Sequence, residues 1–213
     1  IVKGVLEGDL ALKGYGDPRL GFEQFWLLLR QLRARGLREI RGDLVLDRSY
    51  FDPGAHDPAR FDGEPLRPYN VGPDALLVNY KVIRLDFVPD ISKKILAVSA
   101  EPAPPQFDLV NLVKLGDGAC GSVWYEGIRM DLSETGAASR LILTGTYPAA
   151  CGEKSRSVSV MSHAQFVAGV FRQLWAELGG KFSGGLREGV LPAQARLLAR
   201  NESPTLAEVV RDI

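Results

Sequence analysis

The stretch that decides the fold is SHAQFVAGVFRQLWAELG, residues 162–179. Ser162 and Gln165 match a capping box, in which each side chain bonds the backbone N–H of the other residue. Apolar residues then recur at the spacing of one helix face until Gly179, a typical C-terminal stop. The pattern predicts a helix whose buried face consists of Phe166, Val167, Val170, Phe171, Leu174, Trp175 and Leu178.

The sequence before this helix, Leu76 to Val160, is typical of β-structure. Residues 83–87 alternate between apolar and polar side chains, and Pro89 to Lys93 indicates the turn of a hairpin leading into Ile95 to Ser99. Further strands are expected around Phe107–Leu115, Ile128–Leu132 and Arg140–Leu143.

The N-terminal part predicts a strand, a helix and a strand, followed by a long loop. The strand contains Val5, Leu6, Leu10 and Leu12 and runs into a Gly-rich turn. Residues 22–36 have helical spacing, with Gly36 as the stop. Ile40 to Asp47 reads as the second strand. Residues 48–74 contain five prolines, and a loop of this length in a compact protein usually serves or covers a site.

The C-terminal part begins with a glycine-rich stretch, 179–189, followed by a strand-like piece at Arg196 to Ala199. Ser203 as N-cap and Pro204 in the first turn then predict a helix. Its expected core positions are Leu206, Val209, Val210 and Ile213. Because the sequence stops here without a helix terminator, we expect the native polypeptide to continue, and the start inside an apolar strand suggests the same at the other end.

Composition excludes several classes of protein. The chain has 46% hydrophobic and 24% charged residues, the balance of an ordinary globular domain. Lys plus Arg equals Asp plus Glu, at 26 each, so there is no net field to attract nucleic acid or anionic lipid. Apolar runs such as Phe25 to Leu29 are too short to cross a bilayer.

Few side chains in the sequence are candidates for catalysis, metal binding or disulfide formation. His56 lies near Asp52 and Asp57 and is either a solvated loop histidine or a ligand or base, whereas His163 is interpreted as a surface residue in the first turn of its helix. Residues 116–121 are interpreted as a turn rather than a phosphate-binding loop. The two cysteines, Cys120 and Cys151, are either a disulfide or two buried thiols on their spacing alone.

The motifs of serine acyl enzymes are missing from the sequence. A Ser-x-x-Lys pair on a helix would place a hydroxyl and an amine on one face, but Ser92 is followed by Lys93 and Lys94 and then by Ile95. The chain contains no Lys-Thr-Gly, Ser-x-Asn or Gly-x-Ser-x-Gly motif either. No nucleophile is therefore assigned.

Four segments, in order, resemble one family of enzymes. They are GDLALKGYGDP (8–18), IRGDLVLDRSYF (40–51), RPYN (67–70) and ALLVNY (75–80). The chain resembles the class C low-molecular-mass penicillin-binding proteins, which are D-alanyl-D-alanine carboxypeptidases and endopeptidases of the bacterial cell wall. The resemblance covers essentially the whole chain.

The resemblance implies an α+β fragment of a multidomain serine acyl enzyme. It would comprise inserted domains, mostly β with packed helices, and the edges of a transpeptidase or β-lactamase-like catalytic domain. The expected division is 1–20 at the end of the first catalytic part, 21–80 in the inserted domain, 81–160 as a second, mainly β inserted domain, 161–200 back in the first insert, and 201–213 as the start of a helix re-entering the catalytic domain.

The resemblance also implies the reaction. A serine outside this segment would be acylated by the penultimate D-alanine of a peptidoglycan stem or by a β-lactam, with no cofactor and no metal. The expected location is the periplasm. Stem peptides and β-lactams are the expected partners of the full-length protein, nucleic acid is not, and peripheral membrane association and homo-oligomerisation stay open.

The resemblance assigns three features within the chain. Asp47 and Phe51 are expected to bind the amino-bearing side chain of the stem, by a charge-assisted hydrogen bond and by ring contact. The alternative is that Asp47 caps a turn and Phe51 belongs to the core. Cys120 and Cys151 fall where family members carry a disulfide, which favours their pairing.

A second hypothesis is a noncatalytic peptidoglycan-binding or scaffolding module derived from the same family. An evolved module should end its last helix with a proper cap, so the uncapped helix argues against it.

Overall fold

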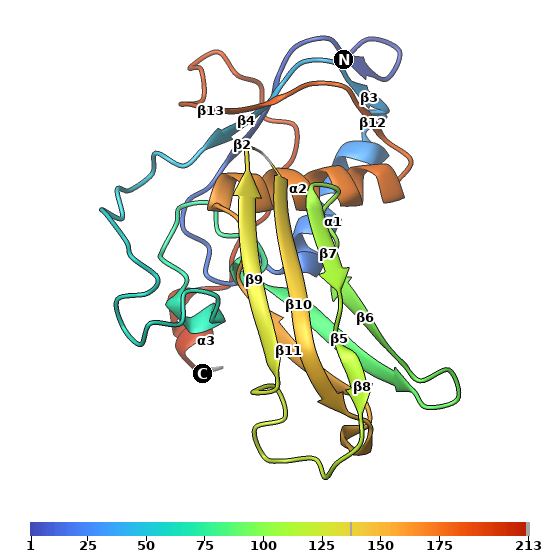
Figure 1. Ribbon diagram of the computed structural model, residues 1–213. Coiled ribbons are helices and arrows are strands. Elements are labelled where there is room, and N and C mark those ends of the chain that lie inside the picture. Colours follow the sequence, from blue (N-terminus) through green and yellow to red (C-terminus); the bar gives the residue numbers. More distant parts are fainter. Residues whose placement is uncertain (137, 212–213) are drawn as a thin grey trace. The chain divides into compact units, whose positions relative to one another are not determined.

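The computed structural model describes residues 1–136 and 138–211, which form two compact units (Figure 1). The first unit contains Ile1–Pro65, Tyr69–Lys81 and the chain from Ser162 onward. The second contains Leu66–Pro68 and the described residues of Val82–Met161. The mixed α and β class expected from the sequence is confirmed, and the division into catalytic and inserted parts stays a prediction.

The first unit is built on three parallel chain segments, each broken once into two short strands. The strands are β1 (Val5–Leu6) and β2 (Leu10–Lys13), β3 (Glu39–Ile40) and β4 (Leu44–Asp47), and β12 (Lys181–Phe182) and β13 (Leu186–Glu188). The hydrogen-bonded orders are β1-β3-β12 and β13-β4-β2, all parallel, so the same middle segment lies between the same two neighbours on both sides of the breaks.

Glycines allow the three segments to approach each other at the breaks. A Cβ on Gly42 would lie 2.3 Å from the carbonyl carbon of Gly8, and a Cβ on Gly184 would lie 1.9 Å from the carbonyl oxygen of Gly42. Both distances are far inside van der Waals contact. Only glycine therefore fits at Gly42 and Gly184 with this backbone.

Carboxylates link the segments just after the glycines. Asp9 Oδ1 accepts a hydrogen bond from the backbone N–H of Asp43 at 2.8 Å, and Asp43 Oδ1 accepts one from Gly185 N–H at the same distance. Arg187 pairs with Asp9 at 2.5 Å. The Gly-Asp-Leu sequence thus recurs on the first two segments, and its carboxylates bridge across all three.

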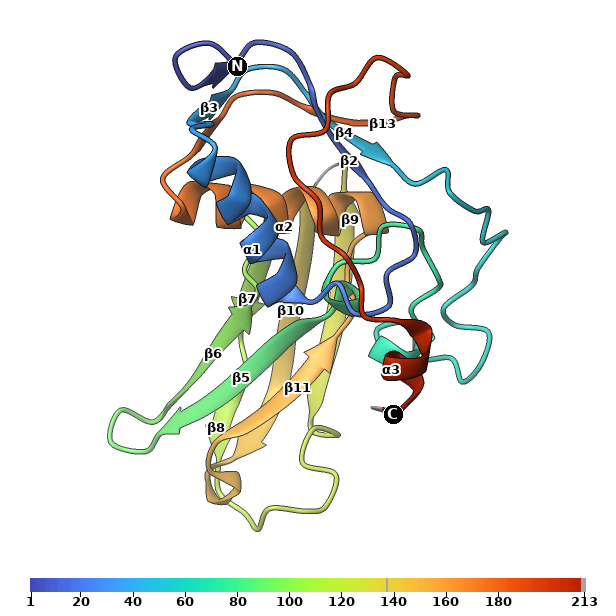
Figure 2. The same ribbon diagram turned by 180° about the vertical axis from the view of Figure 1, so that it is seen from behind.

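The first unit also contains two helices that the sequence predicts. Helix α1 (Phe22–Ala34) links β2 to β3, and α2 (His163–Glu177) precedes β12 and contacts α1 (Figure 2). The capping box of Ser162 and Gln165 is present. The buried residues of α2 are Ala164, Phe166, Val167, Ala168, Gly169, Val170, Phe171, Leu174 and Trp175, so the predicted apolar face, except Leu178, is buried.

The C-terminal expectations are partly wrong. Residues 196–199 form no strand. Helix α3 (Leu206–Arg211) starts after Thr205, not Ser203, because Thr205 Oγ1 accepts from Glu208 N–H while the Glu208 carboxylate accepts from Thr205 N–H. Of the expected core positions, Val209 is buried, Leu206 and Val210 are exposed, and Ile213 lies outside the described residues.

The second unit is mostly β, as predicted. Its first sheet, in the order β11-β5-β6, is antiparallel and consists of β5 (Ile83–Asp90), β6 (Ile95–Glu101) and β11 (Lys154–Val158). Its second, in the order β7-β10-β8 with β9 also on β10, consists of β7 (Phe107–Asn111), β8 (Lys114–Gly116), β9 (Ile128–Thr135) and β10 (Ala138–Pro148). Pro89 and Asp90 belong to β5, so the hairpin turn falls later than expected, at residues 91–94.

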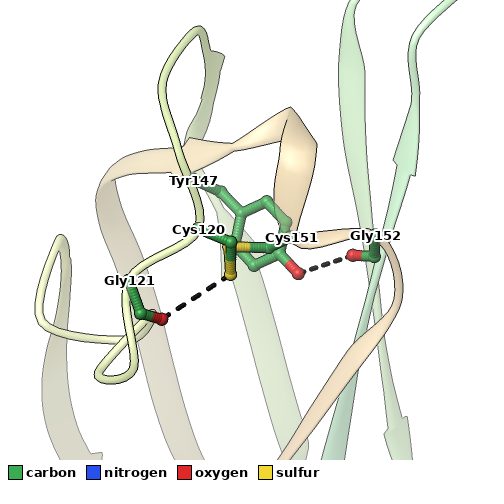
Figure 3. The surroundings of a disulfide bond; sticks show 5 residues. All are labelled: Cys120, Gly121, Tyr147, Cys151 and Gly152. Carbon is green, nitrogen blue, oxygen red and sulfur yellow. Dashed lines mark hydrogen bonds between the residues drawn. A yellow bond between two sulfur atoms is a disulfide. The ribbon is translucent and has the colours of Figure 1, made fainter.

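Aromatic side chains and a disulfide hold the second unit together. Phe87 of β5 stacks on Tyr147 of β10, with ring centroids 6.0 Å apart, and both are fully buried. Cys120 is bonded to Cys151 in the short turn η3 (Ala149–Cys151), and Tyr147 Oη donates to the carbonyl of Gly152 at 2.6 Å (Figure 3). The expected disulfide is thus present, and it ties an exposed loop to the end of β10.

We expect Gly184→Ala to lower the free energy of unfolding by about 2 to 4 kcal/mol, because the added methyl group would displace the backbone of the middle segment. Gly8→Ala is the matched control on the same row of glycines. A Cβ there meets nothing within 4 Å, so its cost should stay below about 1 kcal/mol. Urea denaturation of both variants measures the difference, and equal costs would contradict the close approach.

Candidate functional site

Asp47, at the end of β4, joins three parts of the first unit. Its side chain is fully buried. The carboxylate accepts hydrogen bonds from Ser49 N–H at 3.0 Å, from Ser49 Oγ at 2.6 Å and from Leu191 N–H at 2.8 Å, and it pairs with Lys13 Nζ at 3.1 Å. The end of β2, the loop after β4 and the chain after β13 therefore meet on one carboxylate.

The partners of Asp47 decide its charge. Burial alone would raise the pKa of the carboxyl, but hydrogen bonds from Ser49, Leu191 and Lys13 outweigh burial and hold the pKa well below its usual range. The group is therefore ionised at neutral pH, and its ammonium partner, Lys13, comes from the chain itself.

A second ion-pair network follows directly after Asp47. Arg48 donates from Nε to both carboxylate oxygens of Asp74, at 3.0 and 2.9 Å, and a second contact joins its Nη2 to the same group. Its Nη1 reaches Glu188 of β13 at 2.5 Å. Asp74 is buried and also accepts from Leu76 N–H. This network ties the far end of the long loop to the strand ends.

Three aromatic side chains lie on the surface next to these networks. Tyr15, Tyr50 and Phe51 are 62%, 60% and 38% exposed, so none belongs to the core. The Tyr15 and Tyr50 rings meet edge to face at 5.2 Å, and the Tyr50 and Phe51 rings do so at 6.4 Å. Lys13 Nζ lies 5.6 Å from the centre of the Tyr15 ring. We call Tyr15, Tyr50 and Phe51 the aromatic surface.

Asp47 and Phe51, the two residues assigned from the sequence, have different surroundings in the structure. Asp47 caps the turn at Ser49, which is the alternative considered for it, whereas Phe51 is exposed and not in the core. A stem-binding role for either residue stays a prediction. Tyr15 and Tyr50 were missed, although each lies within a segment that carries the family resemblance, and that position was the signal available.

The histidines have different surroundings. His56 is exposed and its Nε2 lies 2.7 Å from the carbonyl oxygen of Asn70, which fits a loop residue. His163 is half-buried, with Nε2 3.1 Å from the carbonyl oxygen of Gly72, so its interpretation as a surface residue is wrong. Residues 1–136 and 138–211 contain no cluster of three or more His, Cys, Asp or Glu side chains suited to a metal ion.

None of the helices in the described part of the chain is long and apolar enough to cross a membrane.

Solved structures share this fold. The crystal structure of penicillin binding protein 4 (dacB) from Haemophilus influenzae matches with a TM-score of 0.75 and 22% identity, over 100% of this chain and 46% of that one. A second structure of that protein, in complex with a novel β-lactam, matches with a TM-score of 0.65 and 21% identity, over 100% of this chain and 43% of that one. The fold is thus that of part of a low-molecular-mass penicillin-binding protein.

Two curated proteins with similar sequences are also named as D-alanyl-D-alanine carboxypeptidases. The D-alanyl-D-alanine carboxypeptidase DacB of Haemophilus influenzae is 44% identical over 57 residues, 27% of this chain and 12% of its own. The D-alanyl-D-alanine carboxypeptidase of Actinomadura sp. (strain R39) is 24% identical over 208 residues, 95% of this chain and 38% of its own. This chain therefore spans less than half the length of either relative.

The model of the D-Ala-D-Ala carboxypeptidase 3 (S13) family matches residues 1–213, and the chain belongs to that family. The resemblance recognised in the sequence is confirmed.

We expect Asp47→Asn to lower the free energy of unfolding by about 2 to 4 kcal/mol at pH 7, because Lys13 would lose its charged partner in a buried site. The pKa of Asp47 is lowered in the folded chain, so this stabilisation is present above the ordinary value of about 3.9 and is lost as pH falls through the folded-state pKa. Urea denaturation at pH 7 measures the first effect, and a series that continues down to about pH 2 follows the loss.

Asp108→Asn is the control, since Asp108 pairs with Arg140 on an exposed surface. It should change stability by less than about 1 kcal/mol. A cost as small for Asp47→Asn would show that the buried carboxylate does not hold the strand ends together.

Proposed function

We propose that the chain is the noncatalytic central portion of a serine-type D-Ala-D-Ala carboxypeptidase or endopeptidase that acts on peptidoglycan stem peptides. One observation carries the proposal. The family model matches every residue from 1 to 213, yet none of the serines in this sequence has a lysine three positions later. The nucleophile and its base would therefore lie on polypeptide outside these residues.

In the proposed reaction, a serine hydroxyl activated by a neighbouring lysine attacks the carbonyl of the penultimate D-alanine. The terminal D-alanine, or the crosslinked stem, leaves with the proton, and water then hydrolyses the ester. A β-lactam would acylate the same serine, and one solved relative has been crystallised with such a compound. No cofactor takes part in this scheme.

The contribution of this segment would be recognition of the stem side chain. Phe51 would make the direct contact in this proposal; its ring is partly exposed, and its neighbours in the aromatic surface extend the apolar area, which supports the assignment. Asp47 is a positioning residue in this proposal. Its carboxylate already holds Lys13, so an incoming ammonium group would have to displace that lysine to reach it.

The proposed location is the periplasm. Family membership connects the chain to enzymes named for D-Ala-D-Ala substrates, and a disulfide such as Cys120–Cys151 persists in oxidising compartments. The proposed partners are stem peptides and, for the full-length protein, β-lactams.

We expect no covalent labelling of this chain by a fluorescent penicillin, and covalent labelling of the parent enzyme that carries the flanking segments. In-gel fluorescence after denaturation measures the difference. A labelled 213-residue chain would overturn the proposal that the nucleophile lies elsewhere. An unlabelled parent protein would favour a noncatalytic wall-binding module instead.

In the parent enzyme, we expect Phe51→Ala to raise KM for a stem peptide with a free side-chain amine by about 5- to 10-fold, because part of a ring contact worth about 1.5 to 3 kcal/mol is lost. Penicillin acylation, which involves no stem side chain, should change less than about twofold. Phe61→Ala is the control, since Phe61 is 83% exposed and outside the aromatic surface. An unchanged KM for Phe51→Ala would refute the contact.

A further inference from the structure

The second unit has a long strand with one open edge. Strand β9 is hydrogen-bonded to β10 on one side, and β7 and β8 lie on the other side of β10 (Figure 1). Among the described residues, no strand is bonded to the far side of β9. The strand is eight residues long, so this edge is a template on which a further strand can pair.

The backbone groups on the open edge belong to the even-numbered residues of β9. Thr146 N–H donates to the carbonyl of Gly127 at 3.0 Å, which makes these two residues a hydrogen-bonded pair where the β9–β10 ladder begins. Hydrogen-bonded and non-hydrogen-bonded pairs alternate along an antiparallel ladder. The N–H and C=O groups of Met130, Leu132 and Glu134 therefore point away from β10.

Other edges of the second unit are closed, in contrast to this one. Between β7 and β6, the Asn111 side chain donates to the carbonyl of Leu96 at 2.7 Å. On β9, Ile128 N–H is occupied, because it donates to the carbonyl of Tyr125 at 3.0 Å. In residues 1–136 and 138–211, no group accepts from the outward N–H of Met130.

The side chains of β9 form an apolar and a charged face. Ile128 is buried, and Met130 and Leu132 are half-buried. Arg129 and Asp131 are exposed on the opposite face, because successive side chains of a strand alternate. Their charges are opposite in sign and lie symmetrically on either side of Met130.

This symmetry makes the strand complementary to itself. In an antiparallel pair centred on Met130, Arg129 of each copy lies opposite Asp131 of the other, and Ile128 lies opposite Leu132 on the apolar face. A pair centred on Asp131 would place two carboxylates directly opposite each other. A pair centred on Leu132 would set both charged residues opposite hydroxyl side chains. Only the first register pairs every charge on this face.

We propose that two copies of this chain associate through β9, antiparallel and in the register centred on Met130. The two-fold axis is perpendicular to the sheet, so the second sheets of both copies become one. Met130 N–H of each copy donates to the Met130 carbonyl of the other, and Leu132 N–H donates to the carbonyl of Ile128. A strand of different sequence would leave Arg129 and Asp131 unpaired, so the same charges that admit a second copy disfavour other partners.

This inference goes beyond the proposed function and does not depend on it, because the pairing needs no substrate and no residue of the first unit. Sedimentation equilibrium of the 213-residue chain over a concentration series tests it. A strand pair of this length buries little surface, so we expect a reversible dimer with a Kd on the order of 0.1 mM. A chain that stays monomeric up to about 1 mM would overturn the proposal.

Asp131→Arg is the decisive variant, because it sets arginine opposite arginine at two places. Its Kd should rise about tenfold or more, and Arg129→Asp should have the same effect through opposed carboxylates. An equal mixture of the two variants should form a heterodimer as strong as the original dimer, because every charge again faces its opposite. Misfolded variants could not recover in the mixture, so a mixture that stays monomeric would refute this register.

Asp108→Arg is the matched control. It makes the same change of charge on β7, where Asp108 pairs with Arg140 on an exposed surface. The Kd of this variant should change less than about twofold, since direct opposition of charges is what is lost at Asp131. A dimer that Asp108→Arg weakens as much as Asp131→Arg does would contradict the assignment to β9.

Amide NMR spectra of the unaltered chain locate the interface independently of the variants. The amide signals of Met130 and Leu132 should shift as the chain concentration rises, because both N–H groups gain an acceptor in the second copy. The Glu134 amide should shift less, since it lies beyond the paired stretch in this register. Shifts confined to another surface, or a Glu134 shift as large as that of Met130, would contradict the proposed pairing.

Discussion

The close approach of three backbone segments at their breaks is the constraint on which the first unit depends. The strands before and after each break stay in register because the Gly42 and Gly184 backbones lie against neighbouring carbonyl groups, with no room for a side chain. The carboxylates of Asp9 and Asp43 then satisfy backbone donors on the next segment. Without that alignment the ends of β2, β4 and β13 would not meet. Asp47 could then not bind Lys13 and the Leu191 N–H at the same time.

The alignment of the strand ends explains how the Asp47 carboxylate can be buried and still carry its charge. A buried carboxylate is costly unless donors surround it, and Asp47 has a neighbouring donor, Ser49, and two distant ones, Lys13 and Leu191. The result is a fixed loop start from which Tyr50 and Phe51 are held at the surface. The chain belongs to the D-Ala-D-Ala carboxypeptidase 3 (S13) family, and under the proposed function this surface would contact a substrate whose reacting groups lie elsewhere.

Features that depend on neighbouring residues were predictable from the sequence, whereas contacts between residues far apart in the chain were not. The cap and apolar face of α2 depend on spacing within 18 residues, so helix and boundary were predicted together. The partner of Asp47 at Leu191 is 144 residues away, and that of His163 at Gly72 is 91 residues away, distances that no periodicity encodes. Thr205, and not Ser203, caps α3, which shows a further limit: two hydroxyl residues that are two positions apart both match the sequence rule for an N-cap.

The division of the chain into two units also bears on how such chains evolve. Apart from Leu66–Pro68, the second unit is one continuous stretch that the chain enters after Lys81 and leaves at Ser162, and the short turn η2 (Asn79–Lys81) contacts α2, so the two ends of that stretch are neighbours. An excursion with adjoining ends can lengthen, shorten or be exchanged while the strand order of its host stays the same. Residues 82–161 thus have the connectivity of an insertion, whose length could change without altering the strand order of the first unit.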